Sequence, residues 1–313
     1  MGETMRGTLI AGRYELLERA GQGGMATVWR AKARGAANFT RTVAIKRIRR
    51  ELAANSEFVA MFVEEARVGS ELHHPHVVQI FDFGMDHEGR YFLVMEWVEG
   101  MDFGSYLRSY ERAKIYAPWP LVVAICIEAL RGLSAAHERE AGAVIHRDVN
   151  QQNVLLGYDG IAKLTDFGLS RAMDRARMTR PEIVKGKIAY LAPEITMGGS
   201  PSVQSDLFGI GIVLWEALAG RSLFDADTDV QVMINVRNCE VPPLWQVRRD
   251  LPGKLCEAVH TALAKDPEQR FATAHLMARA LAKVLRGVDE DTHAKVIAKS
   301  VREARWRIAE QDG

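Results

Sequence analysis

The feature that most constrains the fold of this chain is a change of pattern near residue 100. Before it lie short runs rich in β-branched and aromatic residues, separated by Gly or charged turns, which is typical of strands. After it lie long segments such as 120–138 and 205–220, several of them apolar around most of their circumference, as buried helices are. The sequence therefore predicts an α+β protein with a small β-rich lobe, about 12–98, and a larger helical lobe, about 99–286.

The first lobe is predicted to hold strands at 13–21, 26–34, 42–48, 77–84 and 91–98. One helix interrupts them between residues 56 and 74, with apolar or small residues mostly three or four positions apart, and Pro75 is expected to end it. In the second lobe only 144–168 again resembles strands.

The tail, residues 287–313, is predicted to be helical. Its apolar residues recur at spacings of three and four: Ala294, Ile297, Val301, Ala304 and Ile308. Two interpretations stay open. The helix could dock a partner or form a homodimer, or it could pack on its own chain, which we favour because two heptads are too short for a self-sufficient coiled coil.

Composition narrows the class of protein. The formal net charge is +1, so no bulk electrostatic argument favours nucleic acid or a membrane surface. Three widely spaced cysteines fit neither a disulfide framework nor a zinc cluster, which favours a reducing compartment. No targeting segment is apparent, and the most apolar stretch, from Leu121, is too short to span a bilayer. We therefore expect a cytoplasmic protein without a membrane segment or a nucleic-acid partner.

Two glycines, Gly21 and Gly23, follow the first long strand. Glycines let the backbone approach a phosphate closely and direct N–H groups at it. Because strands flank this turn on both sides, it fits a hairpin that covers phosphates rather than a Walker loop. Taken alone, the pattern also occurs in ordinary hairpins.

Lys46 ends the apolar run "VAIK", and Glu64 and Glu65 lie in the helix that follows. A Lys–Glu pair between a strand and a helix could fix both elements and aim the ammonium at phosphates. The alternative is a surface lysine beside a solvated helix face.

Asp148, Asn153 and Asp166 place three oxygen-bearing groups within nineteen positions, in or beside strand-flanked turns. Such oxygens suit Mg²⁺ held jointly with nucleotide phosphates. Any one of the three, taken alone, would more often be a turn residue.

In chain order the motifs are Gly-x-Gly-x-x-Ala-x-Val, Val-Ala-Ile-Lys, Glu, His-Arg-Asp-x₄-Asn, Asp-Phe-Gly and Ala-Pro-Glu. This ordered set resembles the eukaryotic-like (Hanks-type) protein kinases, specifically the bacterial Ser/Thr kinases, over about residues 12–286. The resemblance implies a bilobal signalling enzyme that uses ATP and Mg²⁺ to phosphorylate protein substrates, including itself, on Ser/Thr.

The resemblance also implies roles for single residues. Lys46, paired with Glu65, would hold the α- and β-phosphates, and Asp148 would accept the proton of the substrate hydroxyl. Mg²⁺ would bind to Asn153 and Asp166. The expected nucleotide contacts are Gly21 and Gly23 over the phosphates, Val28 and Ala44 above the base, Leu155 below it, the backbone of Glu96 and Val98 at adenine, Asp102 at the ribose, and Met95 as gatekeeper. Three further residues would be structural: Glu194 and Arg270 as a buried ion pair, and Asp206 as a brace of the catalytic loop.

Three positions depart from the family pattern. Ala26 replaces the third glycine, Asn150 stands where these kinases usually have a lysine, and Lys187 replaces the usual threonine of the substrate-binding segment. We hypothesise that Lys187 reaches Asp148 and supplies the cation that position 150 lacks. The alternative is that Lys187 points to solvent and Asn150 merely caps a turn, which would leave a slow kinase.

Two further questions stay open in the sequence. Phosphorylation of Thr179 could order its loop by pairing with Arg147 and Lys163, but an unmodified threonine in a basic loop is equally compatible. A pseudokinase that serves as a nucleotide-binding scaffold is the rival function. The presence of the strand lysine, the base and both metal ligands favours an active enzyme.

Overall fold

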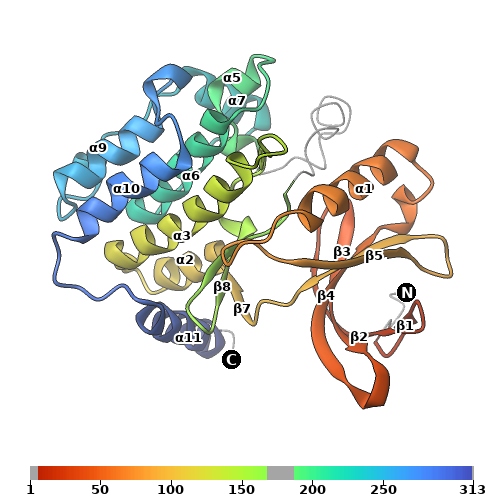
Figure 1. The fold of residues 1–313 in the computed structure, drawn as a ribbon. Helices are drawn as coiled ribbons and strands as arrows, with labels where there is room; N and C mark the ends of the chain where they lie inside the picture. Colours follow the sequence, from red (N-terminus) through yellow and green to blue (C-terminus); the bar gives the residue numbers. More distant parts are fainter. Residues whose placement is uncertain (1–5, 168–186, 312–313) are drawn as a thin grey trace. The chain divides into compact units, whose positions relative to one another are not determined.

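The computed structural model describes residues 6–167 and 187–311 (Figure 1). Two compact units form within the chain. Among the described residues, the smaller unit takes in 6–73 and Val78–Trp97, and the larger takes in His74–Val77, Val98–Phe167 and 187–311. Each unit has its own core and is described by itself.

The smaller unit is a six-stranded antiparallel sheet in the order β1-β2-β3-β4-β6-β5. Its strands are β1 (Leu9–Ile10), β2 (Tyr14–Gln22), β3 (Ala26–Arg34), β4 (Thr40–Ile48), β5 (Ile80–Met85) and β6 (Tyr91–Glu96). One face buries a core that includes Leu16, Val43 and Ile45. Because side chains alternate along a strand, Ala44 and Lys46 belong to the opposite face. Helix α1 (Ser56–Ser70) packs against β5 and β6.

The larger unit is mostly helical (Figure 1). Its helices are α2 (Phe103–Arg112), α3 (Trp119–His137), α5 (Pro193–Thr196), α6 (Val203–Ala219), α7 (Asp229–Asn238), α8 (Leu244–Val247), α9 (Gly253–Ala262), α10 (Ala274–Leu285) and α11 (Ala294–Gln311). A small sheet joins β7 (Gly100–Asp102), β8 (Val154–Gly157) and β9 (Ala162–Leu164). Helices α3 and α6 pack together at its centre. This arrangement of a β-rich lobe and a helical lobe confirms the predicted fold class.

The local predictions were wrong at three places. Helix α1 ends at Ser70, before Pro75, because the Glu71 N–H turns back to the carbonyls of Val68 and Gly69. Of the predicted strand region 144–168, the structure describes 144–167, and within that part only β8 and β9 are strands. Helix α2 was not predicted, although Phe103, Tyr106 and Tyr110 are buried at helical spacing.

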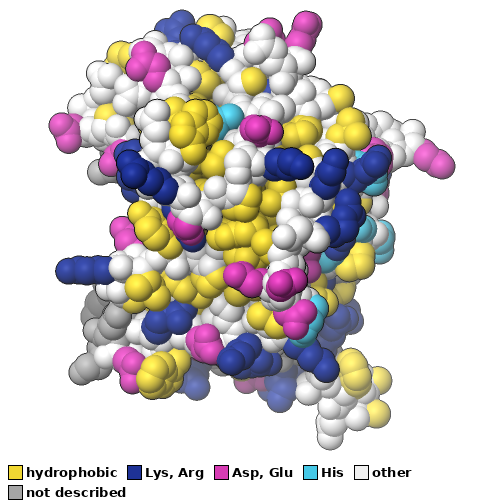
Figure 2. All heavy atoms as spheres, turned by 90° about the vertical axis from the view of Figure 1, so that its left-hand side faces the viewer, with side chains coloured by type: hydrophobic (Ala, Val, Ile, Leu, Met, Phe, Trp, Pro, Cys, Tyr) yellow, Lys and Arg dark blue, Asp and Glu magenta, His cyan; other side chains and the backbone are white. Residues whose placement is uncertain are grey.

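Helix α3 contains the apolar stretch that was predicted to be buried. Among the described residues it is the one helix long and apolar enough to cross a membrane. Its most apolar 18 residues have a mean hydropathy of 1.5, yet 78% of them are buried inside the protein. On the face drawn in Figure 2, Lys and Arg side chains are interspersed with Asp and Glu, in keeping with the net charge of +1. The three cysteines are unpaired, and Cys126 and Cys256 are buried.

Candidate functional site

Lys46 and Glu65 form a buried ion pair within the smaller unit. The Lys46 Nζ lies 2.7 Å from the Glu65 Oε1, and the two side chains are only 6% and 3% exposed. Glu64 instead pairs with Arg67 on the surface of α1. Since Lys46 lies on β4 and Glu65 on α1, the pair joins the sheet to its helix and fixes where the ammonium lies.

The glycine-rich turn joins β2 to β3, and Gly21 belongs to the same face of the sheet as Lys46. Gly21 is paired with Val28 across these strands, and Val28 is in turn paired with Lys46. A Cβ atom added at Gly21 would meet nothing within 4 Å, so the backbone there is open to an incoming group. Ala44 lies two residues before Lys46 and opposite Met95, which puts both on this face as well.

A buried carboxylate on α6 holds the loop that carries Asp148. Asp206 accepts hydrogen bonds from the backbone N–H groups of His146 and Arg147, at 2.7 and 2.8 Å, and its Oδ2 lies 2.8 Å from the His137 Nε2. Arg147 has a φ of +68°, a left-handed conformation that side chains other than Gly rarely adopt. The strain at Arg147 is therefore held by two charge-assisted hydrogen bonds, as expected for a site whose geometry is fixed in advance.

Two side chains meet the carboxylate of Asp148. The Asn153 Nδ2 donates to the Asp148 backbone carbonyl at 2.7 Å and to its Oδ2 at 3.1 Å. The Lys187 ammonium also donates to this Oδ2. Lys187 therefore does not point to solvent, although its side chain remains 36% exposed.

Asn150 caps the short 3₁₀ turn Gln151–Asn153. Its Oδ1 accepts from the N–H groups of Gln152 and Asn153 at 2.9 and 3.1 Å, while its Nδ2 donates to the Asp148 carbonyl at 3.0 Å. The structure thus combines one part of each alternative: Asn150 caps a turn, and Lys187 contacts Asp148.

The β8–β9 ladder brings Asn153 and Asp166 to the same end of the small sheet. Val154 pairs with Leu164, and the Thr165 N–H donates to the Asn153 carbonyl at 3.0 Å. Asp166 has a φ of +64°, a second left-handed residue. These positions offer an amide oxygen and a carboxylate, a small oxygen set of the kind that Mg²⁺ accepts when phosphates and waters complete its shell. The residues present therefore fit a magnesium–nucleotide site.

His146 joins the residues that follow β9 to the loop that carries Asp148, a contact that the sequence analysis did not predict. Its Nε2 lies 2.9 Å from the Thr165 carbonyl oxygen, its Nδ1 accepts the Asp148 N–H, and its ring lies 4.5 Å from that of Phe167. Its place directly before Arg147-Asp148 was the available signal.

Asp102 and Leu155 are neighbours across the β7–β8 ladder. The Asp102 carboxylate is the N-cap of α2 and accepts from the Ser105 N–H at 2.8 Å and the Ser105 hydroxyl at 2.5 Å. In the smaller unit, the Glu96 N–H is already bonded to the Gln79 carbonyl at 2.8 Å. Val98 follows β6, just beyond Trp97 at the boundary between the two units.

Glu194 and Arg270 form the expected ion pair. The Arg270 guanidinium, with a fully buried side chain, donates to both carboxylate oxygens of Glu194 at 2.8 and 2.7 Å. It also donates to three backbone carbonyls. The pair thus fixes the segment that follows Lys187.

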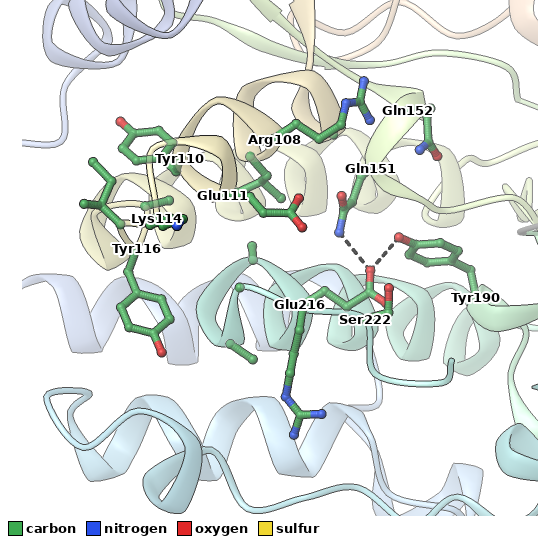
Figure 3. A pocket seen from close by; sticks show the side chains of 18 residues that line it. Arg108, Tyr110, Glu111, Lys114, Tyr116, Gln151, Gln152, Tyr190, Glu216 and Ser222 are labelled. Carbon is green, nitrogen blue, oxygen red and sulfur yellow. Dashed lines mark hydrogen bonds between the residues drawn. The ribbon is translucent and has the colours of Figure 1, made fainter. Parts of the chain in front are cut away.

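A pocket of about 530 Å³ opens beside Gln151 and Gln152, which follow Asp148 (Figure 3). At its floor, Glu216 accepts hydrogen bonds from the Gln151 amide at 2.8 Å and the Tyr190 hydroxyl at 2.5 Å. Burial raises the pKa of Glu216, because its hydrogen-bond donors offset the loss of water only in part. Gln151 and Gln152, which follow Asp148 in the sequence, line this pocket together with residues of α2 and α6 in the larger unit. The sequence analysis did not place Glu216 and Tyr190 together in a pocket, because they are 26 positions apart.

Thr179, the candidate regulatory residue, lies outside the described residues. Arg147, its proposed partner, lies on the loop held by Asp206.

Comparison with known proteins gives one consistent family. Residues 14–282 match the model of the protein kinase domain. The chain is 40% identical over 275 residues to tyrosine-protein kinase MasK of Myxococcus xanthus, covering 86% of this chain and 42% of that protein. It is 34% identical over 275 residues to serine/threonine-protein kinase PrkC of Bacillus subtilis, covering 87% of this chain and 40% of that protein.

A solved structure agrees. The kinase domain of Mycobacterium tuberculosis PknI superposes with a TM-score of 0.67 and 26% identity, covering 90% of this chain and 99% of that domain. The chain spans about two fifths of the length of MasK and PrkC. On the family match, the chain belongs to the protein kinases.

Proposed function

We propose that this protein kinase transfers the γ-phosphoryl group of ATP to Ser or Thr hydroxyls of protein substrates, including its own chain. The observation that carries the proposal is the environment of Asp148. Its carboxylate is held by the Asn153 amide and the Lys187 ammonium. The loop that carries it is fixed by backbone hydrogen bonds to Asp206. Such a preorganised carboxylate suits the acceptance of a proton from an attacking hydroxyl.

In the proposed reaction, the substrate oxygen bonds to the γ-phosphorus as the bond from that phosphorus to the β–γ bridging oxygen breaks. The hydroxyl proton passes to Asp148, and ADP leaves. Lys46, oriented by Glu65, would hold the α- and β-phosphates, and Lys187 would face the negative charge of the γ-phosphoryl group. Asn153 and Asp166 would hold Mg²⁺, which neutralises phosphate charge when bound.

The remaining nucleotide contacts are part of the same proposal. Gly21 and Gly23 would cover the phosphates, Val28 and Ala44 would pack above the base, and Leu155 would pack below it. The other proposed contacts are the backbone of Glu96 and Val98 at adenine and Asp102 at the ribose. Support comes from the shared sheet face of Gly21, Val28, Ala44 and Lys46, and from the pairing of Asp102 with Leu155.

An active enzyme is favoured over a pseudokinase scaffold. A scaffold needs neither a buried Lys–Glu pair nor a catalytic carboxylate held by two donors, and this chain has both. The specificity for Ser/Thr rests on relatives such as PrkC and the serine/threonine-protein kinase PknA of Mycobacterium tuberculosis, whereas MasK is named a tyrosine kinase.

One experiment tests both points. The purified chain is incubated with Mg-ATP, and its phosphosites are mapped by mass spectrometry, with Asp148→Asn as the inactive control. We expect phosphoserine and phosphothreonine in the wild type and none in the control. Equal labelling of the control would overturn the catalytic assignment, and phosphotyrosine alone would overturn the Ser/Thr specificity.

Thr179 is the residue that we propose for activation by autophosphorylation. A phosphate there would carry close to two negative charges and could pair with Arg147 and Lys163. After full autophosphorylation, Thr179→Ala should be slower than the wild type in phosphorylating a separate protein substrate. Equal rates for the two proteins would contradict this role.

A further inference from the structure

Helix α11 lies beyond residue 282, where the match to the protein kinase domain ends. It nevertheless packs into the larger unit, against α2, β7 and β8 (Figure 1). Its buried face consists of Ile297, Ala298, Ser300, Val301 and Ala304. The apolar face of α11 therefore packs on its own chain, as favoured from the sequence.

A buried cluster of hydroxyl groups joins α11 to α2. The Ser300 Oγ lies 2.8 Å from the Tyr106 hydroxyl and 2.9 Å from the Tyr110 hydroxyl, and the two tyrosine hydroxyls are 3.2 Å apart. Two turns further along α11, the Arg307 guanidinium lies 4.2 Å from the centre of the Tyr110 ring and donates to the Ser109 hydroxyl. Three residues of α2 are thus held by two residues of α11.

The first turns of α11 are held by the connection between β8 and β9. Gly160, with a φ of +83°, passes so close to the helix that an added Cβ would lie 1.8 Å from the Ala294 carbonyl oxygen. The Arg302 guanidinium donates to the Tyr158 carbonyl at 2.7 Å. The helix is therefore anchored at both ends, to α2 and to the turn after β8.

The anchored elements carry two of the proposed nucleotide contacts. Strand β7 ends at Asp102, which caps α2, and Asp102 pairs with Leu155 of β8. We propose that α11 is a brace that sets the position of this nucleotide-binding edge, with Ser300 as its positioning residue acting through Tyr106 and Tyr110. The proposal rests on the nucleotide roles proposed above for Asp102 and Leu155.

Helix α2 needs such a brace because it is too short to be stable by itself. It has ten residues, fewer than an isolated helix needs to be stable in water. Tyr106 is fully buried, so its hydroxyl depends on partners inside the protein, and Ser300 is one of them. Loosening α11 should therefore let α2 and Asp102 move, which weakens ATP binding without removing any group that takes part in the chemistry.

The test compares two placements of the same substitution on α11. Ala304→Glu puts a carboxylate on the buried face, whereas Ala309→Glu puts it on the exposed face of the same helix. Ser300→Ala removes only the hydroxyl and covers the case in which Ala304→Glu fails to fold. Asp102→Ala removes the proposed ribose contact together with the cap of α2, and Asp102→Asn, which keeps an N-cap acceptor, is its control. For each variant, KM for ATP and kcat are measured with a protein substrate, and hydrogen exchange is followed in α2.

We expect Ser300→Ala to raise KM for ATP about fivefold (~1 kcal/mol), the low end for a hydroxyl that bonds both Tyr106 and Tyr110, with kcat little changed. Ala304→Glu should raise KM further and speed exchange in α2, and Ala309→Glu should match the wild type. Partial unfolding would instead lower the apparent kcat at constant KM. If Asp102→Ala raises KM but Ser300→Ala and Ala304→Glu do not, the brace is wrong and the nucleotide site stands. If Asp102→Ala also leaves KM unchanged, the nucleotide assignment and the brace both fall.

Discussion

Replacing Lys187 with Met removes a cation from Asp148 while keeping an unbranched side chain of similar length. In the family pattern a lysine at position 150 would stand near the transferring group, and here that position is Asn150, which is occupied in capping a turn. If Lys187 supplies the missing charge, Lys187→Met should slow the chemical step.

The expected losses of stability and of kcat in Lys187→Met follow from the exposure of the Lys187 side chain. With 36% of its side chain exposed, Lys187 forms an ion pair that is partly screened by water, so its loss should change the free energy of unfolding by about 1 kcal/mol or less. The transition state is different, because removing one preorganised group that stabilises developing charge costs about 10²–10³-fold in kcat. The partial exposure favours the lower end, about 10²-fold, or ~2.7 kcal/mol.

The assay is the steady-state rate of phosphorylation of a protein substrate at saturating Mg-ATP, with Lys187→Arg as the control that keeps the charge. We expect Lys187→Met to lose kcat with KM for ATP little changed, and Lys187→Arg to keep most of it. An unchanged or faster Lys187→Met enzyme would refute the reasoning, as would an equal loss in both variants.

The cap made by Asn150 determines what we expect of a double variant that combines Lys187→Thr with Asn150→Lys. Asn150→Lys would restore a cation, but it would remove the two hydrogen bonds that cap Gln151–Asn153. Because that turn sets the position of Asn153, adding Asn150→Lys to Lys187→Thr should lower kcat further. Recovery of activity would show that the cap matters less than the charge.

Other predictions follow from single contacts. Lys46→Met should abolish phosphoryl transfer and, since its partner Glu65 is buried, should also lower the free energy of unfolding by about 3–5 kcal/mol; turnover in a folded variant would contradict the assignment. Arg270→Met should lower the free energy of unfolding by a similar ~3–5 kcal/mol, measured with urea, because both oxygens of the Glu194 carboxylate lose their guanidinium partner. Burial raises the pKa of Glu216 above its ordinary value of 4.5, so the folded state favours the protonated form. The stability of the wild type relative to Glu216→Gln should therefore fall as the pH rises from about 4.5, and a difference that rises with pH would show the opposite sign.

The sequence by itself determined the order of the elements and the chemistry of the motifs. Strand β3 was predicted with its observed bounds, and α6 within two residues at its first end, because long runs of strong periodicity depend little on their surroundings. Lys46, Asp148 and Asp166 were identified from their local motifs. Helix α2 was missed because its apolar residues are few and its burial depends on α11, almost two hundred positions later.

Spacing and local motifs by themselves left open which side chains meet, and the tertiary structure decided it. Glu64 and Glu65 are adjacent in sequence, and only the family resemblance favoured Glu65; the orientation of α1 sends Glu64 to the surface and Glu65 to Lys46. Lys187 and Asp148 are 39 positions apart, and their contact depends on a segment fixed by Glu194 and Arg270. Asn150 as the cap of a turn was one alternative from the sequence, and the structure shows that it holds together with the contact between Lys187 and Asp148. Periodicity reports the burial of a face, whereas a contact between distant residues depends on how whole elements pack, and that is settled by the summed energetics of the core.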